Sequence, residues 1–451
     1  MKFSLSLLLS LTLLQPATSS SSAAISPHKP TFVTSPDEFG ALGDGSSDDS
    51  IPISKALAAC GDQDLPCHVI FAEDKHYLSG PIRLERSEIT LEVNGELSML
   101  PRRDYCKAED CTAPSQGSFI GNSVSSDPRE CWHVGTPAGE YKVCISDIKI
   151  TGSGTISAKN PWQWWPCKYL PCKVDWRPHL IIMDNVERVT IEGVTLKDSP
   201  NHFIEVVQSV TNRLHDLTFT APYISPNTDG VNFYGGFDSI LSDSTIDNGD
   251  DCISVVPINE FAGTCDGNKD DTDIRCSGGH VLIRNITCNG GHGLSIGGVR
   301  HGNVHNVTFE NITVTGGQRG STQDEAAGGG CRVKSYPNGT GVVRDIHYKD
   351  IHFDGVFLPI QLLGHYCPWP CNTPDGDQSV LFKDITFDNI SGSGKQRDTV
   401  VEIKCSEFEP CRNITMNNIN LVAKNGKEGK LTCENVEQIS VDEGSSPNSC
   451  S

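Results

Sequence analysis

The stretch Val307-Thr308-Phe309-Glu310-Asn311-Ile312 decides the fold, because its pattern recurs along much of the chain. Apolar residues alternate with polar ones, as in a β-strand with one buried face. The Asn before the last Ile is typical of a residue at which the chain turns a corner. Similar stretches begin at Val189, Ile240, Val281, Ile346, Ile385 and Ile414.

The spacing of these stretches predicts how they are arranged. From Val281 onward they recur after 26, 39, 39 and 29 residues. The shorter steps suit one coil of a solenoid, and the longer steps suit a coil that carries a loop insertion. A unit of this size buries its apolar side only by stacking on its neighbours. The Leu spacing of leucine-rich repeats is absent, so the sequence predicts an all-β fold, a parallel β-helix.

A short helix is expected at the N-terminal end of this solenoid. Ser50 to Cys60 has Pro52 in its first turn and places Ile53, Ala56 and Leu57 on one face. Such a helix would cap the first coil, whose backbone groups are otherwise unpaired. The alternation of apolar residues between Gly80 and Leu100 predicts the first strands.

The N-terminus and the cysteines indicate a secreted protein. Residues 1–22 combine Lys2, an apolar run to Leu14 and small residues, which predicts a signal peptide. Residues 26–451 are expected to form a single β-helix catalytic domain. Nineteen cysteines suit an oxidising compartment, outside the cell or in the cell wall, and leave one unpaired. Spacing favours the pairs Cys60–Cys67, Cys106–Cys111, Cys167–Cys172, Cys265–Cys276, Cys367–Cys371 and Cys405–Cys411.

The net charge excludes some classes of partner. The 57 acidic and 36 basic residues give a net charge of −21, which argues against nucleic-acid binding. After the signal peptide no apolar run is long enough to cross a membrane. We expect a monomer. Six Asn-x-Ser/Thr sequons predict a glycoprotein, with Asn338 the best candidate for a glycan.

Three carboxylates are expected to lie side by side. Asp250 and Asp251 follow Asp229 by 21 and 22 residues, the length of one coil. Residues one coil apart lie about 4.8 Å from each other. Because such carboxylates repel, at least one should have a raised pKa and hold a proton near neutrality. A protonated carboxyl beside ionised ones can break a glycosidic bond.

One histidine and two cations are expected on the same face. His292 lies about one insertion-bearing coil beyond Asp251, and Arg332 follows it by 40 residues. Residues i and i+2 of a strand point to the same side, so Arg332 and Lys334 would lie together while Val333 points inward. The three carboxylates and two cations would combine hydrolysis with binding of an anionic sugar.

Four motifs in this order resemble the polygalacturonases and their pectin-degrading relatives, glycoside hydrolase family 28. They are Asn227-Thr228-Asp229, Gly249-Asp250-Asp251, Gly291-His292-Gly293 and Arg332-Val333-Lys334. The segments Phe39–Gly45 and Arg177-Pro178 extend the resemblance over nearly the whole mature chain. It implies a right-handed parallel β-helix and cleavage of α-1,4-galacturonosyl bonds with inversion, without a metal or another cofactor.

The resemblance also implies roles for single residues. Asp250 would be the general acid, Asp229 and Asp251 would activate the attacking water, and His292 would support the acid. The substrate, pectin or oligogalacturonate, would be bound by Asn227, Arg332, Lys334 and Tyr366. Cys252 and Cys288 would form a disulfide behind the site.

Alternatives stay open at this point. A rhamnogalacturonan or xylogalacturonan hydrolase is close to the main hypothesis, and a non-catalytic carbohydrate-binding β-helix is a different class. A pectate lyase would use Ca²⁺ and an arginine base, against which the Asp-Asp motif argues. The aromatic segment Trp162–Trp176 would either stack on sugars or pack on the solenoid, with packing favoured. The acidic insert 257–276 would border the groove and leaves endo or exo action open.

Overall fold

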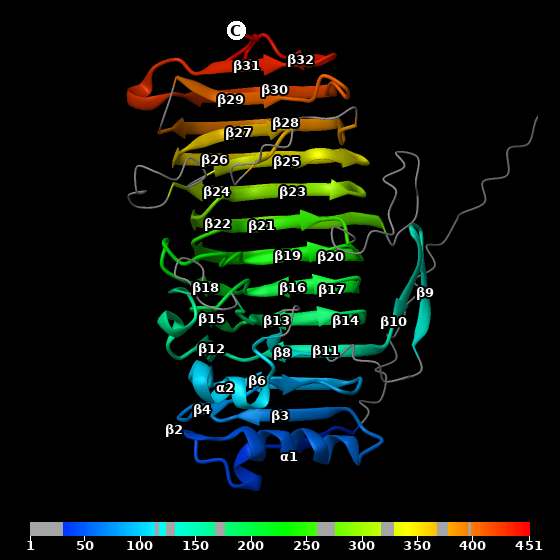
Figure 1. The fold of residues 1–451 in the computed structure, drawn as a ribbon, viewed down its shortest axis with the longest axis vertical. Helices are drawn as coiled ribbons and strands as arrows, with labels where there is room; N and C mark the ends of the chain where they lie inside the picture. Colours follow the sequence, from blue (N-terminus) through cyan, green and yellow to red (C-terminus); the bar gives the residue numbers. More distant parts are fainter. Residues whose placement is uncertain are drawn as a thin grey trace, which may run out of the picture.

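A computed structural model describes residues 30–112, 117–122, 131–166, 176–258, 276–316, 329–367, 378–395 and 398–451. The strands stack as successive rungs along one long axis, with helix α1 at one end and the C-terminus at the other (Figure 1). The fold is a right-handed parallel β-helix; the repeat predicted the parallel β-helix, and the family resemblance implied its hand. The predicted signal peptide lies outside the described residues.

One face of the β-helix is a parallel sheet whose strands and adjoining segments carry the predicted site residues. The described residues place eleven strands in it, in an order that follows the chain. They are β5 (Ile82–Arg83), β8 (Ser118–Gly121), β13 (His179–Asp184), β16 (Ile204–Val207), β19 (Val231–Tyr234), β21 (Asp251–Val256), β23 (Gly293–His301), β25 (Gly329–Thr340), β27 (Leu358–Leu363), β29 (Thr399–Lys404) and β31 (Lys430–Glu434).

The other faces belong to a second parallel sheet, which has nineteen strands among the described residues. One column contains β1 (Phe32–Thr34), β3 (Cys67–Phe71), β6 (Ile89–Val93), β11 (Ile145–Thr151), β14 (Val186–Glu192) and β17 (Val210–His215). A second column contains β2 (Asp44–Asp48), β4 (His76–Ser79), β7 (Glu96–Met99), β12 (Thr155–Ala158), β15 (Thr195–Lys197) and β18 (Thr218–Thr220). From β20 (Phe237–Asn248) onward, long strands join both columns. They are followed along the chain by β22 (Ser277–Gly290), β24 (Asn303–Thr315), β26 (Val342–Val356), β28 (Leu381–Gly394) and β30 (Arg412–Val422), and the short β32 (Ile439–Val441) pairs with β30.

The register of the long strands confirms the repeat from Val281 onward. Val281 pairs with Val307, which pairs with Ile346, and the series continues through Ile385 to Ile414. One earlier alignment was wrong by one residue, because Ile240 pairs with Leu282. The coil containing β17 was also missed, since its buried positions include the polar Asn212.

The recurring Asn or Asp does turn a corner. Asn285, Asn311 and Asn389 have φ values of 56°, 54° and 55°, in the left-handed region that Asn tolerates better than most residues. Asn311 Nδ2 donates to Asn285 Oδ1 at 2.8 Å, and Asn285 Nδ2 donates to Asp243 Oδ1 at 2.8 Å. These side chains therefore form a hydrogen-bonded ladder along the axis, which we call the corner ladder.

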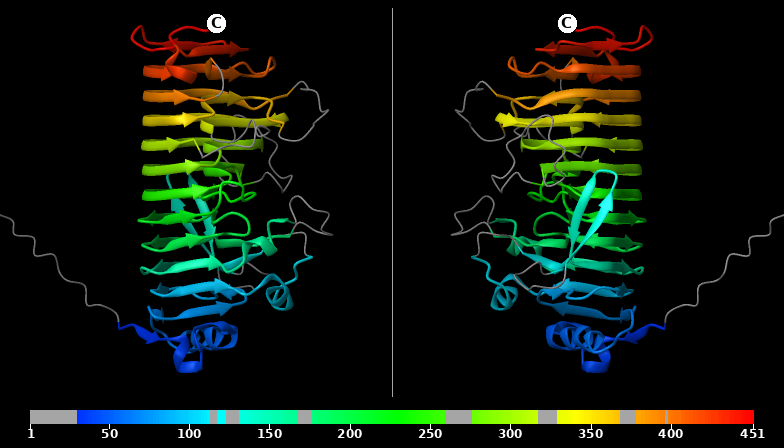
Figure 2. Two further views of the ribbon diagram at one scale, coloured as in Figure 1. Left: turned by 90° about the vertical axis from the view of Figure 1, so that its left-hand side faces the viewer. Right: turned by 90° about the vertical axis from the view of Figure 1, so that its right-hand side faces the viewer.

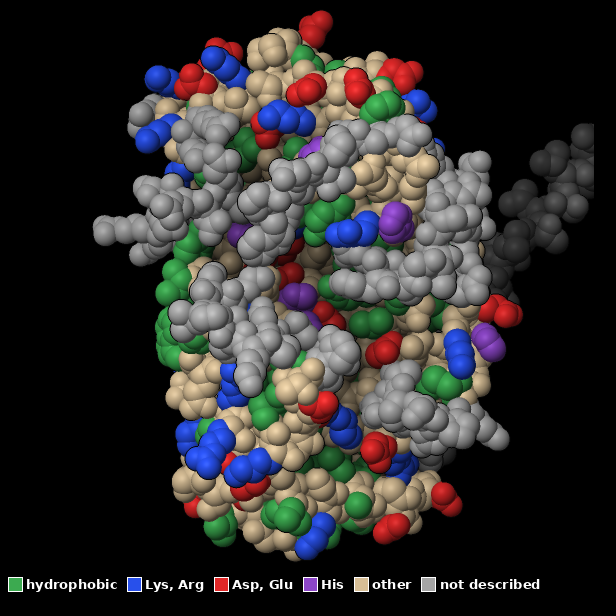
Figure 3. Space-filling model, viewed as in Figure 1, with side chains coloured by type: hydrophobic (Ala, Val, Ile, Leu, Met, Phe, Trp, Pro, Cys, Tyr) green, Lys and Arg blue, Asp and Glu red, His purple; other side chains and the backbone are tan. Residues whose placement is uncertain are grey.

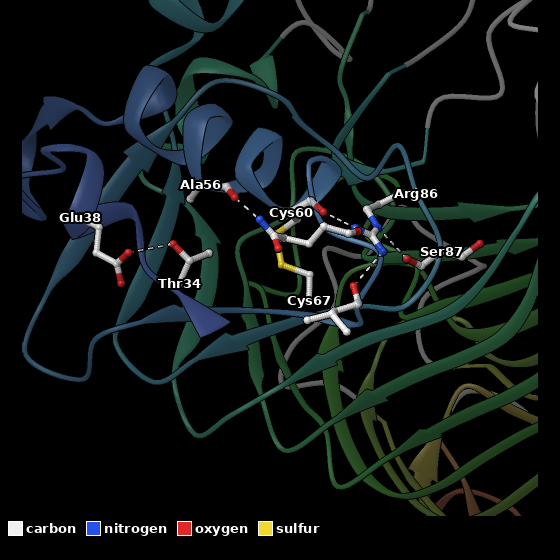
Figure 4. The surroundings of a disulfide bond; sticks show 9 residues. Thr34, Glu38, Ala56, Cys60, Cys67, Arg86 and Ser87 are labelled. Carbon is white, nitrogen blue, oxygen red and sulfur yellow. Dashed lines mark hydrogen bonds between the residues drawn. A yellow bond between two sulfur atoms is a disulfide. The ribbon is translucent and has the colours of Figure 1, made fainter. Parts of the chain in front are cut away.

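The helix predicted at the N-terminal end is α1 (Ser50–Gly61). Ile53 and Ala56 are buried, and Leu57 is partly buried against the core. The disulfide Cys60–Cys67 joins the helix to β3, and Arg86 donates hydrogen bonds to the backbone oxygens of Cys60, Gln63 and Leu65 (Figure 4). The strands begin earlier than predicted, at β1. The alternation of apolar residues did not reveal β1 and β2, because both strands are short and β2 is polar.

Two other elements lie outside the stack. The hairpin β9 (Trp132–Thr136) and β10 (Gly139–Val143) lies along the side of the stack (Figure 2), where Tyr141 donates a hydrogen bond to the backbone oxygen of Gly236 at 2.9 Å. Helix α2 (Arg102–Ala108), which the sequence did not predict, packs Tyr105 against Trp164. Short 3-10 turns are η1 (Pro36–Phe39), η2 (Pro161–Gln163) and η4 (Lys424–Gly426).

The described residues of the aromatic segment Trp162–Trp176 mainly pack on the solenoid, which was the favoured alternative. Trp164, Trp165 and Trp176 are almost fully buried, whereas Trp162 is 56% exposed. The core of the described residues is one large cluster that runs from Ala41 to Leu431, with a small second cluster under the hairpin. Among the described helices, none combines the length and apolar character that a membrane span needs.

The disulfides confirm several predicted pairs. Cys60–Cys67, Cys106–Cys111, Cys405–Cys411 and Cys252–Cys288 are present. Two unpredicted pairs, Cys131–Cys144 and Cys433–Cys450, also occur, and buried Cys331 is a free thiol among the described residues. The pairs Cys167–Cys172, Cys265–Cys276 and Cys367–Cys371 each include residues outside the described part.

Candidate active site

The predicted site residues gather on the face formed by the eleven-stranded sheet. Asp229 lies two residues before β19, Asp250 and Asp251 lie at the start of β21, and His292 directly precedes β23. On the face shown in Figure 3, acidic and His side chains lie together in a hollow near the middle of the long axis. The prediction that successive coils bring these groups together is therefore confirmed, but the groups are mostly buried rather than open to solvent.

Asp250 is held by three neighbours. His292 Nδ1 lies 2.8 Å from Asp250 Oδ1, and the backbone N–H of Asp251 donates to the same oxygen at 2.8 Å. Asn227 Nδ2 donates to Asp250 Oδ2 at 3.4 Å. A carboxylate with this many donors is fixed in position and is stabilised in its charged form.

Asp251 is paired with a cation. Lys334 Nζ lies 2.7 Å from Asp251 Oδ2, and Ser295 Oγ donates to Oδ1 at 2.7 Å. Arg332 Nη1 is 3.9 Å from Oδ1 and has no hydrogen-bond partner among the described residues. Because all three charged side chains are buried, the arrangement leaves Arg332 with bonding capacity for an incoming anion.

Asp229 is also buried and contacts an amide and a histidine. Asn232 Nδ2 donates to its Oδ2 at 3.1 Å, and His202 Nε2 lies 3.5 Å from its Oδ1. Burial is the main reason that the pKa of Asp229 is raised to about 7, and the charges of Asp250 and Asp251 add to it. Asp229 is thus the carboxyl with the raised pKa that the sequence predicted for this cluster.

The pKa of Asp250 moves the other way. Burial opposes the shift, but the charge and hydrogen bond of His292, with Lys334 and the Asp251 N–H, hold it well below its ordinary value. Burial likewise opposes the rise in the pKa of His292, which Asp250 causes. Without substrate the proton of the His292–Asp250 pair therefore lies on His292.

The two cations lie beneath an aromatic ring. Val333 points into the core, so Arg332 and Lys334 share one side of β25 as predicted. The Tyr366 ring centroid is 5.2 Å from Lys334 Nζ and 5.9 Å from Arg332 Cζ. Burial raises the pKa of Tyr366 to about 12, so its hydroxyl stays protonated and can donate to a ligand. The fourth predicted binding residue, Asn227, has φ 52° and accepts a hydrogen bond from the buried Arg177 at 2.8 Å.

A second polar cluster adjoins Asp229 and was not found from the sequence. It contains His179 on β13, His202 just before β16, and Glu205 on β16. Glu205 Oε1 is 2.8 Å from His202 Nδ1 and 3.4 Å from His179 Nδ1. The available signal was one acidic residue in the otherwise apolar run Ile204–Val207, whose charge needs a partner when buried.

Among the described residues, two sets of side chains have donor atoms close enough to share a metal ion. They are His179, His202 and Glu205, and Asp250, Asp251 and His292, each with atoms within 4.8 Å of one another. Both sets contain a short His–carboxylate contact of 2.8 Å. Such contacts are those of hydrogen-bonded ion pairs, which satisfy the same atoms that would otherwise bind a metal.

Comparisons with known proteins indicate the family to which the chain belongs. A polygalacturonase of Persea americana is 29% identical over 90% of this chain and 78% of its own length. An exopolygalacturonase of Thermotoga maritima matches the fold with a TM-score of 0.66, at 20% identity over 91% of this chain and 92% of its own. An endo-xylogalacturonan hydrolase of Aspergillus tubingensis gives 0.65, at 20% identity over 92% of this chain and all of its own. The model of "Glycosyl hydrolases family 28" matches residues 140–450, which include every predicted site residue. Since that match covers most of the chain, the protein belongs to glycosyl hydrolases family 28 and is a glycoside hydrolase.

Proposed function

We propose that the protein is a secreted, inverting polygalacturonase that hydrolyses α-1,4-galacturonosyl bonds in demethylated pectin. The observation that carries this proposal is one cluster in which three carboxylates lie beside buried Arg332 and Lys334. The carboxylates supply acid and base for glycoside cleavage, and the cations match the carboxylate of each galacturonate. The disulfides fit an extracellular location.

Asp250 is the general acid in this proposal. The His292–Asp250 pair holds one transferable proton, which lies on His292 before substrate binds. When a galacturonate carboxylate approaches Lys334 and Arg332, their positive charge is shared with it and stabilises the Asp250 carboxylate less. The pKa of Asp250 then rises, the proton moves to it, and Asp250 protonates the leaving glycosidic oxygen as the C1–O bond breaks.

Asp229 and Asp251 activate the attacking water. Above its pKa of about 7, whose rise by burial is opposed by the charge of His202, Asp229 can accept a proton from water. Asp251 is paired with Lys334 and orients the same water. The water oxygen bonds to C1 on the side opposite the leaving oxygen, so the anomeric configuration inverts.

The test follows products of polygalacturonate by NMR and by size. Immediate release of the β-anomer supports inversion, and saturated galacturonate products support hydrolysis. Monomers as first products indicate exo action, and a ladder of oligomers indicates endo action. An unsaturated product, or cleavage restricted to rhamnose- or xylose-substituted polymer, would contradict the proposed function.

A further inference from the structure

His202 connects Asp229 to a buried acid behind it. Its Nδ1 lies 2.8 Å from Glu205 Oε1, while its Nε2 lies 3.5 Å from Asp229 Oδ1. One imidazole therefore lies between two carboxylates. The side chains of His202 and Glu205 are 18% and 12% exposed, so water screens these charges weakly.

The coils fix this contact. Glu205 on β16 pairs in register with Asn232 on β19, and Ile182 on β13 pairs with Glu205. Asn232 Nδ2 donates to Asp229 Oδ2 at 3.1 Å. Glu205 and Asn232, the neighbours of His202 and Asp229, are therefore held in register on adjacent strands.

The groups that face His202 favour its charged form. Glu205, Asp229 and, further away, Asp250 are acidic and raise its pKa to about 9, although burial opposes them. His179 packs against it with ring centroids 4.7 Å apart. Burial lowers the pKa of His179 to about 4, so it is neutral near pH 7, and Arg177 adds to that shift. The charge of Glu205 also acts on Asp184, where it adds to the rise in pKa that burial causes.

Each of the three site carboxylates thus has its own cationic neighbour. Asp250 has His292, Asp251 has Lys334, and Asp229 has His202. We propose that His202, held as an imidazolium by Glu205, is a positioning residue that favours the ionised form of Asp229 and orients it to accept a proton from the attacking water. This proposal rests on the proposed hydrolysis and assigns a role to residues outside the four motifs.

The test compares His202→Gln and Glu205→Gln with His215→Gln. The control removes a His that contacts a carboxylate, Glu192, at 3.1 Å on the strand β17 of the other sheet. Initial rates on an oligogalacturonate of defined length give kcat and KM from about pH 4 to pH 8. Thermal unfolding of each variant checks that it is folded.

The two variants should differ in which limb of the pH profile moves. Without the His202 charge Asp229 stays protonated to higher pH, so His202→Gln should shift the acid limb of kcat upward by about one unit and lower kcat about tenfold or more at the acid end. KM should change less than about threefold. Glu205→Gln leaves His202 charged at acid pH, so its acid limb should stay and its losses should grow as pH rises. His215→Gln should match the wild type.

Several results would overturn this role. One is a folded His202→Gln variant that keeps the wild-type acid limb, or losses of equal size at every pH. Another is loss of wild-type activity on chelation with recovery on adding Zn²⁺, which would make His179, His202 and Glu205 metal ligands. A ¹⁵N titration needs no substrate, and a neutral His202 imidazole at pH 7 would also overturn it. If the wild type cleaves no galacturonan although His202 titrates as charged, the proposed function is wrong, while the charged state of His202 is not contradicted.

Discussion

Lys334 Nζ lies 2.7 Å from Asp251 Oδ2, so a residue expected to bind substrate also neutralises one of the site carboxylates. Both side chains are almost fully buried. Substrate binding and the charge state of the acid cluster are therefore coupled through one ion pair, because a galacturonate carboxylate at Lys334 competes with Asp251 for the same cation.

This coupling predicts that Lys334→Met lowers stability as well as activity. Removing one partner of a buried pair leaves Asp251 uncompensated and should destabilise the fold by about 3 kcal/mol. The double variant Lys334→Met/Asp251→Asn should recover most of the stability and none of the activity, as measured by thermal unfolding and reducing-end release. A single variant that unfolds like the wild type would mean that the pair contributes little to the fold.

Asp250→Asn tests the general acid. We expect a loss of about a thousandfold or more on oligogalacturonate, because its leaving oxygen needs a proton. An aryl galacturonide with an acidic phenol as leaving group needs less protonation and should lose much less. Asp229→Asn is the matched comparison, since loss of the base should slow both substrates alike. If the aryl substrate rescues Asp229→Asn instead, the two roles are exchanged.

Asp184 predicts a pH dependence of stability. Burial, with some help from the charge of Glu205, raises the pKa of Asp184 to about 7. Because the folded pKa lies above the unfolded value, this stabilisation is complete below about pH 4 and is lost as pH rises through 7. Asp184→Asn, which retains an oxygen to accept the Asn185 hydrogen bond, should therefore melt higher than the wild type at pH 8 and equally at pH 4.

The matched variant for that experiment is Asp147→Asn. The hydrogen bond from Arg188 holds the pKa of Asp147 below its ordinary value, although burial opposes it. Its stabilisation is present above about pH 4 and is lost as pH falls, so the substitution should lower the melting temperature at pH 8 and have less effect in acid. Equal pH dependence in both variants would contradict the assigned pKa directions.

The corner ladder makes a prediction for Asn311. Asn311→Ala loses the 2.8 Å hydrogen bond to Asn285 and also places a Cβ-bearing residue without a polar side chain at φ 54°. Left-handed backbone costs such a residue about 1 kcal/mol. Asn311→Gly loses the bond but not the backbone fit, so its melting temperature should lie between those of Asn311→Ala and the wild type. A glycine variant that melts below the alanine variant would show that backbone strain is not the larger effect.

The sequence predicted those features that repeat. The corner Asn and the 22-residue step from Asp229 to Asp251 depend on one coil being like the next, and the structure confirms that step by pairing Val231 with Ile253. It did not predict the Glu205–His202–Asp229 contact, because this joins residues that share no motif. It also did not predict how deeply Arg332 is buried, which depends on the packing of neighbouring coils and loops. The one-residue error at Ile240 arose because buried Ser239 and Ser244 occupy the positions that pair with Val281 and Ile286, so apolar residues do not mark those positions in this coil.

Stacking has a consequence for how the family can diversify. A residue's position along the axis depends on which rung it occupies, and rungs separated by 22, 39 or 42 residues of chain still pair directly. Segments between rungs can therefore lengthen or shorten during evolution while the acids and cations keep their mutual distances. New sugar preferences can arise at the rim of the groove without any change to the groups that break the bond.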